Sequence, residues 1–109
     1  MKGEMKKAVD EFVNRLQKLH SSQISDIFLY GSQARGDQKE YSDVDILIIA
    51  NTKDWRFKHE VSNIASDVSL EFDILLDTHV ISQENWEKMR NANFSYYQNI
   101  ISDGIAIAL

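Results

Sequence analysis

The chain has 109 residues and a net charge of −5, from 17 acidic and 12 basic side chains. It has no cysteine and no apolar run near the roughly 18 residues of a membrane span, so we expect no disulfide, no thiolate metal site and no membrane insertion. The acidic balance argues against direct binding along a nucleic-acid backbone. We expect a single domain over residues 1–109, located in the cytoplasm.

The first half of the chain alternates between helical and strand patterns. Apolar residues at helical spacing predict an amphipathic helix over about residues 4–20. Two short apolar runs, 26–30 and 44–50, indicate buried strands. A second helical stripe covers about residues 53–68, with Asn51 and Thr52 as candidate caps.

The second half continues the alternation. The run "LEFDILL" at 70–76 predicts a third strand. Ser82, followed three residues later by Asn85, predicts the N-cap of a helix near 83–91. A further helix over 94–102 should stop at Asp103-Gly104, before a last short strand. Strands separated by helices predict an α/β fold, with helices packed on a sheet.

Three aspartates lie in or beside the predicted strands. Asp43 and Asp45 are two residues apart in an extended segment, so their carboxylates point to the same face. Asp73 lies inside the third predicted strand and converges with them if the two strands are neighbours. Carboxylates this close repel one another, and a divalent cation, Mg²⁺ above all, offsets the repulsion. One such aspartate alone would favour a solvated turn or cap, whereas the three together predict a metal site.

A glycine-serine pair follows the first predicted strand. Gly31 lets the backbone approach a ligand closely, and a helix beginning after it would offer free N–H groups to a phosphate. Ser32 adds a hydroxyl donor and Arg35 could add a cation. The pair alone is a weak signal, because neither G-x-x-x-x-G-K-[ST] nor G-x-G-x-x-G occurs in the chain.

The two motifs together carry a family resemblance. Gly31-Ser32, ten residues, and then Asp43-Val44-Asp45 resembles the G-S-x10-D-x-D signature of the DNA polymerase β-like nucleotidyltransferases. The stretch "GSQARGDQKEYSDVDILI" is especially similar to the minimal nucleotidyltransferases encoded beside HEPN-domain proteins. The resemblance implies a polymerase β-like fold, an α/β arrangement with a small mixed sheet and helices packed on it.

The resemblance also implies a role for each motif residue. The nucleotide-binding residues would be Gly31, Ser32 and Arg35. The catalytic residues, which would also bind two Mg²⁺ ions or Mn²⁺ in their place, would be Asp43, Asp45 and Asp73. Gln33 departs from the family pattern, because an arginine often follows the glycine-serine pair, and one phosphate contact is thereby removed.

The activity implied by the resemblance is transfer of AMP from ATP to a hydroxyl, a tyrosine of a cognate HEPN toxin, with this chain as the antitoxin. Two alternatives stay open. One is an antitoxin that neutralises a HEPN partner by binding alone. The other is a small-molecule nucleotidyltransferase like the aminoglycoside enzymes, which carry a second domain. The sequence leaves open whether the chain forms homo- or hetero-oligomers.

Histidines and aromatic residues outside the motifs favour structural roles. The three histidines, His20, His59 and His79, have no ligand spacing and are predicted at the surface or at caps. The tryptophans, Trp55 and Trp86, are predicted in or near the core. The cluster Phe94, Tyr96 and Tyr97 favours core packing, with a protein interface as the alternative.

Overall fold

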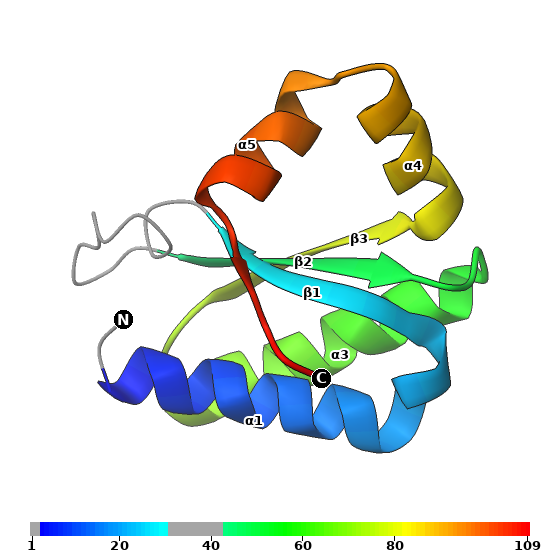
Figure 1. Ribbon diagram of the computed structural model, residues 1–109. Helices are drawn as coiled ribbons and strands as arrows, with labels where there is room; N and C mark the ends of the chain where they lie inside the picture. The colour runs from blue at the N-terminus through cyan, green and yellow to red at the C-terminus, as the bar shows by residue number, and fades with distance from the viewer. Residues whose placement is uncertain (1–2, 31–42) are drawn as a thin grey trace.

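The computed structural model describes residues 3–30 and 43–109. The predicted α/β fold is confirmed: helices pack on both faces of a central sheet (Figure 1). The elements, in chain order, are α1 (Gly3–His20), the 3₁₀ turn η1 (Ser21–Gln23), β1 (Ile24–Tyr30), β2 (Val44–Ala50), α3 (Trp55–Phe72), β3 (Leu76–Ser82), α4 (Gln83–Asn91), α5 (Ser95–Asp103) and β4 (Ile105–Ala106). None of the described helices is long and apolar enough to cross a bilayer.

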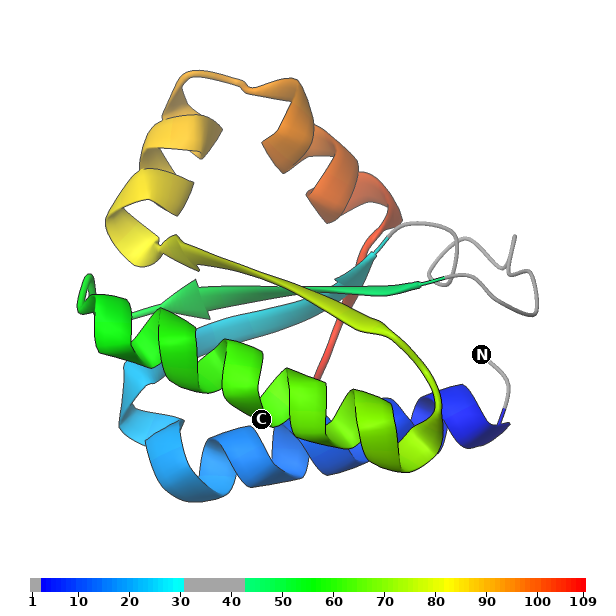
Figure 2. The same ribbon diagram turned by 180° about the vertical axis from the view of Figure 1, so that it is seen from behind.

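The sheet is mixed, with the strand order β3-β2-β1-β4. β1 pairs antiparallel with both β2 and β4, whereas β2 and β3 are parallel. Helices α1 and α3 lie on one face, and α4 and α5 on the other, as the two opposite views show (Figures 1 and 2). The register places Tyr30, Asp45 and Asp77 in one row across β1, β2 and β3.

One face of the sheet, here called the core face, is closed and apolar. It carries alternate residues of β2, and all four are 1% exposed or less: Val44, Ile46, Ile48 and Ala50. They pack with buried apolar residues of α1 and α3, among them Phe12, Leu16, Phe57, Val61 and Val68. This face therefore holds the main hydrophobic core, because a strand with period two presents every second residue to the same side.

The opposite face, here called the site face, carries the other residues of β2. Leu47 and Ile49 are buried there with Trp86 of α4 and Ile100 of α5. Asp45 belongs to this face by the same alternation, and it is only half-buried. The site face is thus polar near the start of β2, at Asp45, and apolar further along the strand, at Leu47 and Ile49.

The third strand begins later than the sequence predicts, and the prediction of a strand over 70–76 is wrong. Helix α3 continues through Phe72, which packs against the main core at the position four residues after Val68. The helix ends at Asp73, which adopts the left-handed conformation with φ 53° and donates its amide hydrogen to the Ser69 carbonyl. A seven-residue apolar run is compatible with a helix or with a strand by periodicity alone. Packing of Phe72 against the core favours the helix.

The predicted N-cap is confirmed for helix α4 and wrong for helix α3. The Ser82 hydroxyl accepts a hydrogen bond from the Asn85 amide at 3.2 Å, which confirms the predicted N-cap of α4. Helix α3 is capped by Asp54, whose carboxylate accepts from the Arg56 amide at 3.0 Å, rather than by either predicted residue. Thr52 supports that cap by accepting a hydrogen bond from the amide of Asp54.

The C-terminal stop is confirmed at Gly104. The amide of this glycine donates to the Ile100 carbonyl at 2.8 Å, and a Cβ here would collide with the same carbonyl oxygen. A residue without a side chain is therefore needed where α5 ends. The predicted last strand is present but short: it covers Ile105 and Ala106, which pair with β1.

Candidate active site

Two carboxylates and an imidazole meet at the polar end of the site face. Asp45, Asp77 and His79 each offer one ligand atom, and these atoms lie within 4.8 Å of one another. Asp45 and Asp77 are paired in the parallel register of β2 and β3. His79 follows two residues after Asp77 on β3, so the two side chains share a face. Nε2 of His79 lies 3.5 Å from Oδ2 of Asp77.

Negative charge is unfavourable at Asp45. Burial is the main cause that raises the pKa of its carboxyl above the usual value, and the neighbouring charge of Asp77 is the second. Asp43 and a hydrogen bond to Asp77 act in the same direction, while His79 opposes them. A bound cation would relieve this repulsion, because it favours the ionised form of both carboxylates.

A tyrosine pair lies beside the carboxylates. Tyr30 is the β1 neighbour of Asp45, and burial raises the pKa of its hydroxyl well above the usual range. A hydrogen bond with Tyr96 of α5 is the next cause, followed by the charge of Tyr96 and then of the two aspartates. The two tyrosine rings are perpendicular, with centroids 6.3 Å apart. The contact between Tyr30 and Tyr96 thus joins α5 to the sheet next to the site.

The structure brings together only part of the predicted acidic set. Asp45 lies in β2 as predicted, and Asp43 is an exposed residue immediately before this strand. Asp73, predicted to lie in a strand beside them, instead ends helix α3 and precedes β3 by three residues. The strand carboxylate next to Asp45 is Asp77. The predicted convergence of Asp73 with the pair is corrected accordingly, since it depended on a misplaced strand.

The predicted phosphate-binding residues lie outside the described part of the chain. Gly31, Ser32 and Arg35 all fall within residues 31–42. Their role stays a prediction. β1 ends at Tyr30, directly before the glycine-serine pair, and β2 begins directly after Asp43. Both motifs thus adjoin the strand ends that meet beside the carboxylates.

Sequence reasoning missed Asp77 and His79. The signal was present as "DTH", an aspartate and a histidine two residues apart, but it becomes visible only once the third strand is placed at 76–82. His79 is half-exposed, as predicted, but it belongs to the cluster rather than to a cap.

The aromatic predictions have mixed outcomes. Trp86 is buried and packs on Tyr97 with ring centroids 4.7 Å apart, which confirms the core prediction for both. Trp55 is 72% exposed, so its predicted place near the core is wrong, because it lies on the outer side of the first turn of α3. Phe94 and Tyr96 are 52% and 36% exposed, so the core prediction is wrong for these two residues, and the ring of Tyr96 packs on Tyr30.

The residues present fit a divalent cation of the kind that the resemblance implies. Two carboxylate oxygens and an imidazole nitrogen form a donor set that divalent ions accept in proteins. Asp77 and His79 are 49% and 47% exposed, which leaves room for a substrate oxygen or water at the same ion. The cluster is therefore an open site rather than a closed structural one.

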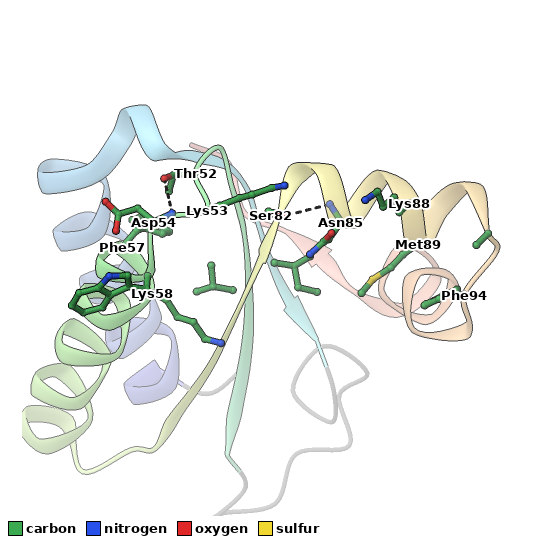
Figure 3. Close-up of a pocket in the computed structure, with 14 residues that line it drawn as sticks. Thr52, Lys53, Asp54, Phe57, Lys58, Ser82, Asn85, Lys88, Met89 and Phe94 are labelled. Carbon is green, nitrogen blue, oxygen red and sulfur yellow. Dashed lines mark hydrogen bonds between the residues drawn. The ribbon is translucent and has the colours of Figure 1, made fainter.

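A separate groove lies at the other end of β3 (Figure 3). It encloses about 700 Å³ between the start of α3, the end of β3 and helix α4. Lys53 and Lys88 line it, and both pair with Glu84, at 2.6 and 3.3 Å. Ser82, at this end of β3, is five residues from Asp77, a distance of about 16 Å along a strand. The groove is therefore distinct from the acidic cluster.

Comparison with known sequences identifies close relatives of the chain. The profile of the nucleotidyltransferase domain family matches residues 9–105. MJ0604 of Methanocaldococcus jannaschii, named as a protein adenylyltransferase, is 35% identical over 98 residues, which are 90% of this chain and 92% of the relative. MJ0141 of the same organism, similarly named, is 35% identical over 74 residues, 67% of this chain and 75% of that protein. An aminoglycoside nucleotidyltransferase (4') of Staphylococcus aureus is 28% identical over 95 residues, 84% of this chain but 38% of the relative.

Solved structures share the fold. A toxin–antitoxin crystal structure with AMP-PNP superposes with a TM-score of 0.55 at 23% identity, covering 87% of this chain and 68% of that one. The MntA-HpeT toxin–antitoxin has a chain that superposes with the same TM-score at 21% identity, covering 99% of this chain and 73% of the other. The observed arrangement of helices on a mixed sheet is thus a known nucleotidyltransferase arrangement.

Proposed function

Because the chain belongs to the nucleotidyltransferase domain family, we propose that it transfers AMP from ATP to a hydroxyl group of a partner protein. The observation that carries the proposal is the pairing of Asp45 with Asp77 on adjacent strands, with Asp43 at the start of the same motif. The relatives named as protein adenylyltransferases support a protein acceptor. The AMP-PNP in the related toxin–antitoxin structure supports an adenine nucleotide as the donor.

Each acidic residue has a proposed task. Asp43, Asp45 and Asp77 hold divalent ions, for which the family resemblance implies two Mg²⁺. When bound, such ions offset the charge of the triphosphate and lower the pKa of an attacking hydroxyl. Asp77 is the more exposed member of the strand pair and takes up the proton that the acceptor hydroxyl loses.

The transfer step forms one bond and breaks one. The acceptor oxygen attacks the α-phosphorus of ATP, the bond from that phosphorus to the bridging oxygen breaks, and pyrophosphate leaves with the bonding electrons. Gly31, Ser32 and Arg35 hold the triphosphate beside the carboxylates in this proposal. Tyr30 contributes no competing charge, because a tyrosine hydroxyl is protonated at neutral pH and burial raises its pKa further.

The proposed acceptor is a tyrosine of a HEPN-domain toxin, and the chain would act as its antitoxin. The family resemblance supports this partner, and the structural neighbours come from toxin–antitoxin complexes. A small-molecule acceptor has weaker support. The aminoglycoside relative extends well beyond the matched region, which is 38% of its length, so most of that protein has no counterpart in this chain.

Co-expression with the protein encoded beside it tests the proposal. The intact mass of the partner should rise by one or more AMP units with the wild-type chain and stay unchanged with Asp45→Asn. Peptide mapping should then place the modification on a tyrosine. A partner that is neutralised equally well by both chains, without any mass increase, would overturn the enzymatic proposal and leave an antitoxin that acts by binding.

A further inference from the structure

His79 adds a nitrogen donor to an otherwise carboxylate site. Its imidazole lies with Asp45 and Asp77 in the cluster whose ligand atoms are within 4.8 Å of one another. Carboxylates and water suit Mg²⁺, whereas imidazole suits first-row transition metals. Magnesium holds imidazole poorly, since it prefers hard oxygen ligands and keeps much of its water. The donor set therefore bears directly on which ion the site selects.

The geometry allows all three side chains to reach one ion. With metal–ligand bonds of about 2.1 Å, adjacent ligand atoms of an octahedral ion are about 3 Å apart and opposite ones about 4.2 Å. Ligand atoms already within 4.8 Å need only small rotations to meet these separations. The register of β2 and β3 fixes the backbone of the three residues, and the half-exposed side chains of Asp77 and His79 have room to adjust.

The imidazole of His79 lies close to the row of residues that carries the two aspartates. The ring centroids of His79 and Tyr30 are 6.1 Å apart. Tyr30 pairs with Asp45 in the register of β1 and β2. Oδ2 of Asp77, which belongs to the same row, lies 3.5 Å from Nε2 of His79. The imidazole thus lies near an aromatic ring and a carboxylate, beside the two aspartates that would hold a cation.

We propose that His79 is a metal ligand and makes this site prefer a first-row transition dication, represented by Mn²⁺, over Mg²⁺. The inference rests on the proposed function for the use of the site, and it differs from the sequence expectation that favours Mg²⁺. His79→Gln keeps a polar side chain at this position but replaces the nitrogen donor with an oxygen donor. The variant therefore tests the identity of the donor atom.

Metal binding to the nucleotide-free protein tests the proposal without relying on activity. Calorimetric titrations with Mn²⁺ and with Mg²⁺ should give an affinity ratio in favour of Mn²⁺ that falls about tenfold in His79→Gln, because the nitrogen donor is lost. Electron spin echo spectroscopy of the Mn²⁺-loaded protein should show nitrogen modulation that the variant lacks. Leaving ATP out matters, since the adenine ring would add nitrogen signals of its own. His59→Gln is the matched control, because His59 lies on α3 beside Trp55, outside the cluster.

The outcomes separate this proposal from the proposed function. Nitrogen modulation in the wild type and in His59→Gln, lost in His79→Gln together with the Mn²⁺ preference, supports the ligand role. An unchanged affinity ratio in His79→Gln, or no nitrogen modulation in the wild type, overturns it. AMP transfer to the partner with either ion would still stand in that case. Conversely, a nitrogen-ligated Mn²⁺ in a chain that never modifies its partner would refute the transfer and leave the metal site in place.

Discussion

The two faces of β2 differ in what their residues do for the protein. On the core face, Ile46 and Ile48 are fully buried under α1 and α3. On the site face, Leu47 and Ile49 are equally buried, but Asp45 interrupts the series near the start of the strand. One seven-residue strand thus anchors the fold on one side and carries the acidic site on the other. Packing on the core face fixes the place of β2 in the fold and thereby the place of the Asp45 carboxylate.

The two faces of β2 also differ in their effect on the stability of the fold. Burial of the core face stabilises the chain in proportion to the apolar area removed from water. On the site face, the carboxylates of Asp45 and Asp77 lie close together, which destabilises the metal-free fold. Truncation of a buried apolar residue should therefore lower the stability of the fold, whereas removal of the Asp45 charge should raise the stability of the metal-free chain.

The largest expected effect is on the core face. Ile48→Ala should lower the free energy of unfolding by about 2–5 kcal/mol, because it removes fully buried methyl groups and leaves a cavity. Ile81→Ala makes the same chemical change on the site face, where the residue is only half-buried, and should cost less than half as much. Urea denaturation of both variants measures the contrast. Equal losses would show that the two faces contribute alike.

A smaller effect is expected at the tyrosine pair. Tyr96→Phe removes the hydrogen bond to Tyr30 and should cost about 1 kcal/mol of unfolding free energy. Tyr30→Phe breaks the same bond, so the double variant should lose much less than the sum of the two single losses. Thermal or urea denaturation of the four proteins completes this cycle. Strictly additive losses would mean that the hydroxyls do not stabilise each other.

The smallest effect concerns the charge of Asp45. Since the pKa of its carboxyl is raised, the folded chain holds this proton more tightly than the unfolded chain, and stability falls as pH rises from the usual value of 3.8 through the raised one. Asp45→Asn should therefore exceed the wild type in stability at pH 7 by a few tenths of a kcal/mol, since solvent screens the exposed part of this half-buried group.

The comparison of Asp45→Asn with the wild type has two controls, one with pH and one with metal ions. The advantage of Asp45→Asn should disappear below pH 3.8, where the wild-type carboxyl is protonated in both states. At pH 7, Mn²⁺ or Mg²⁺ should raise the melting temperature of the wild type more than that of the variant, because a ligand of the native state stabilises it. A variant less stable than the wild type at pH 7 without metal would contradict the proposed repulsion.

Much of this arrangement could be predicted from the sequence. Helix α1, strands β1 and β2, and helix α4 with its Ser82 cap lie close to their expected positions, because each has a clear period and a recognisable boundary. The place of Asp45 follows from the same regularity. Alternation alone puts Val44 and Ile46 on one face and Asp45 on the other.

The position of β3 could not be predicted, and this error determined the choice of the third acidic residue. Residues 70–72 continue the apolar stripe of α3, and only tertiary packing of Phe72 reveals that the helix goes on. The strand then runs from Leu76 to Ser82, where its polar and apolar residues alternate less regularly. Pairing of Asp45 with Asp77 depends on the register between two strands that lie far apart in the chain, which no local pattern encodes.

The most direct test compares AMP transfer by Asp77→Asn and Asp73→Asn. Both changes remove one carboxylate from neighbouring parts of the chain, but only Asp77 lies in the cluster with Asp45. Intact mass spectra of the co-expressed partner should show transfer reduced by at least about a hundredfold for Asp77→Asn, given the several kcal/mol that a metal ion contributes. Asp73→Asn should retain near wild-type transfer, because Asp73 ends helix α3. Full transfer by Asp77→Asn with its loss in Asp73→Asn would contradict the structural assignment and restore the residue that the sequence alone favours.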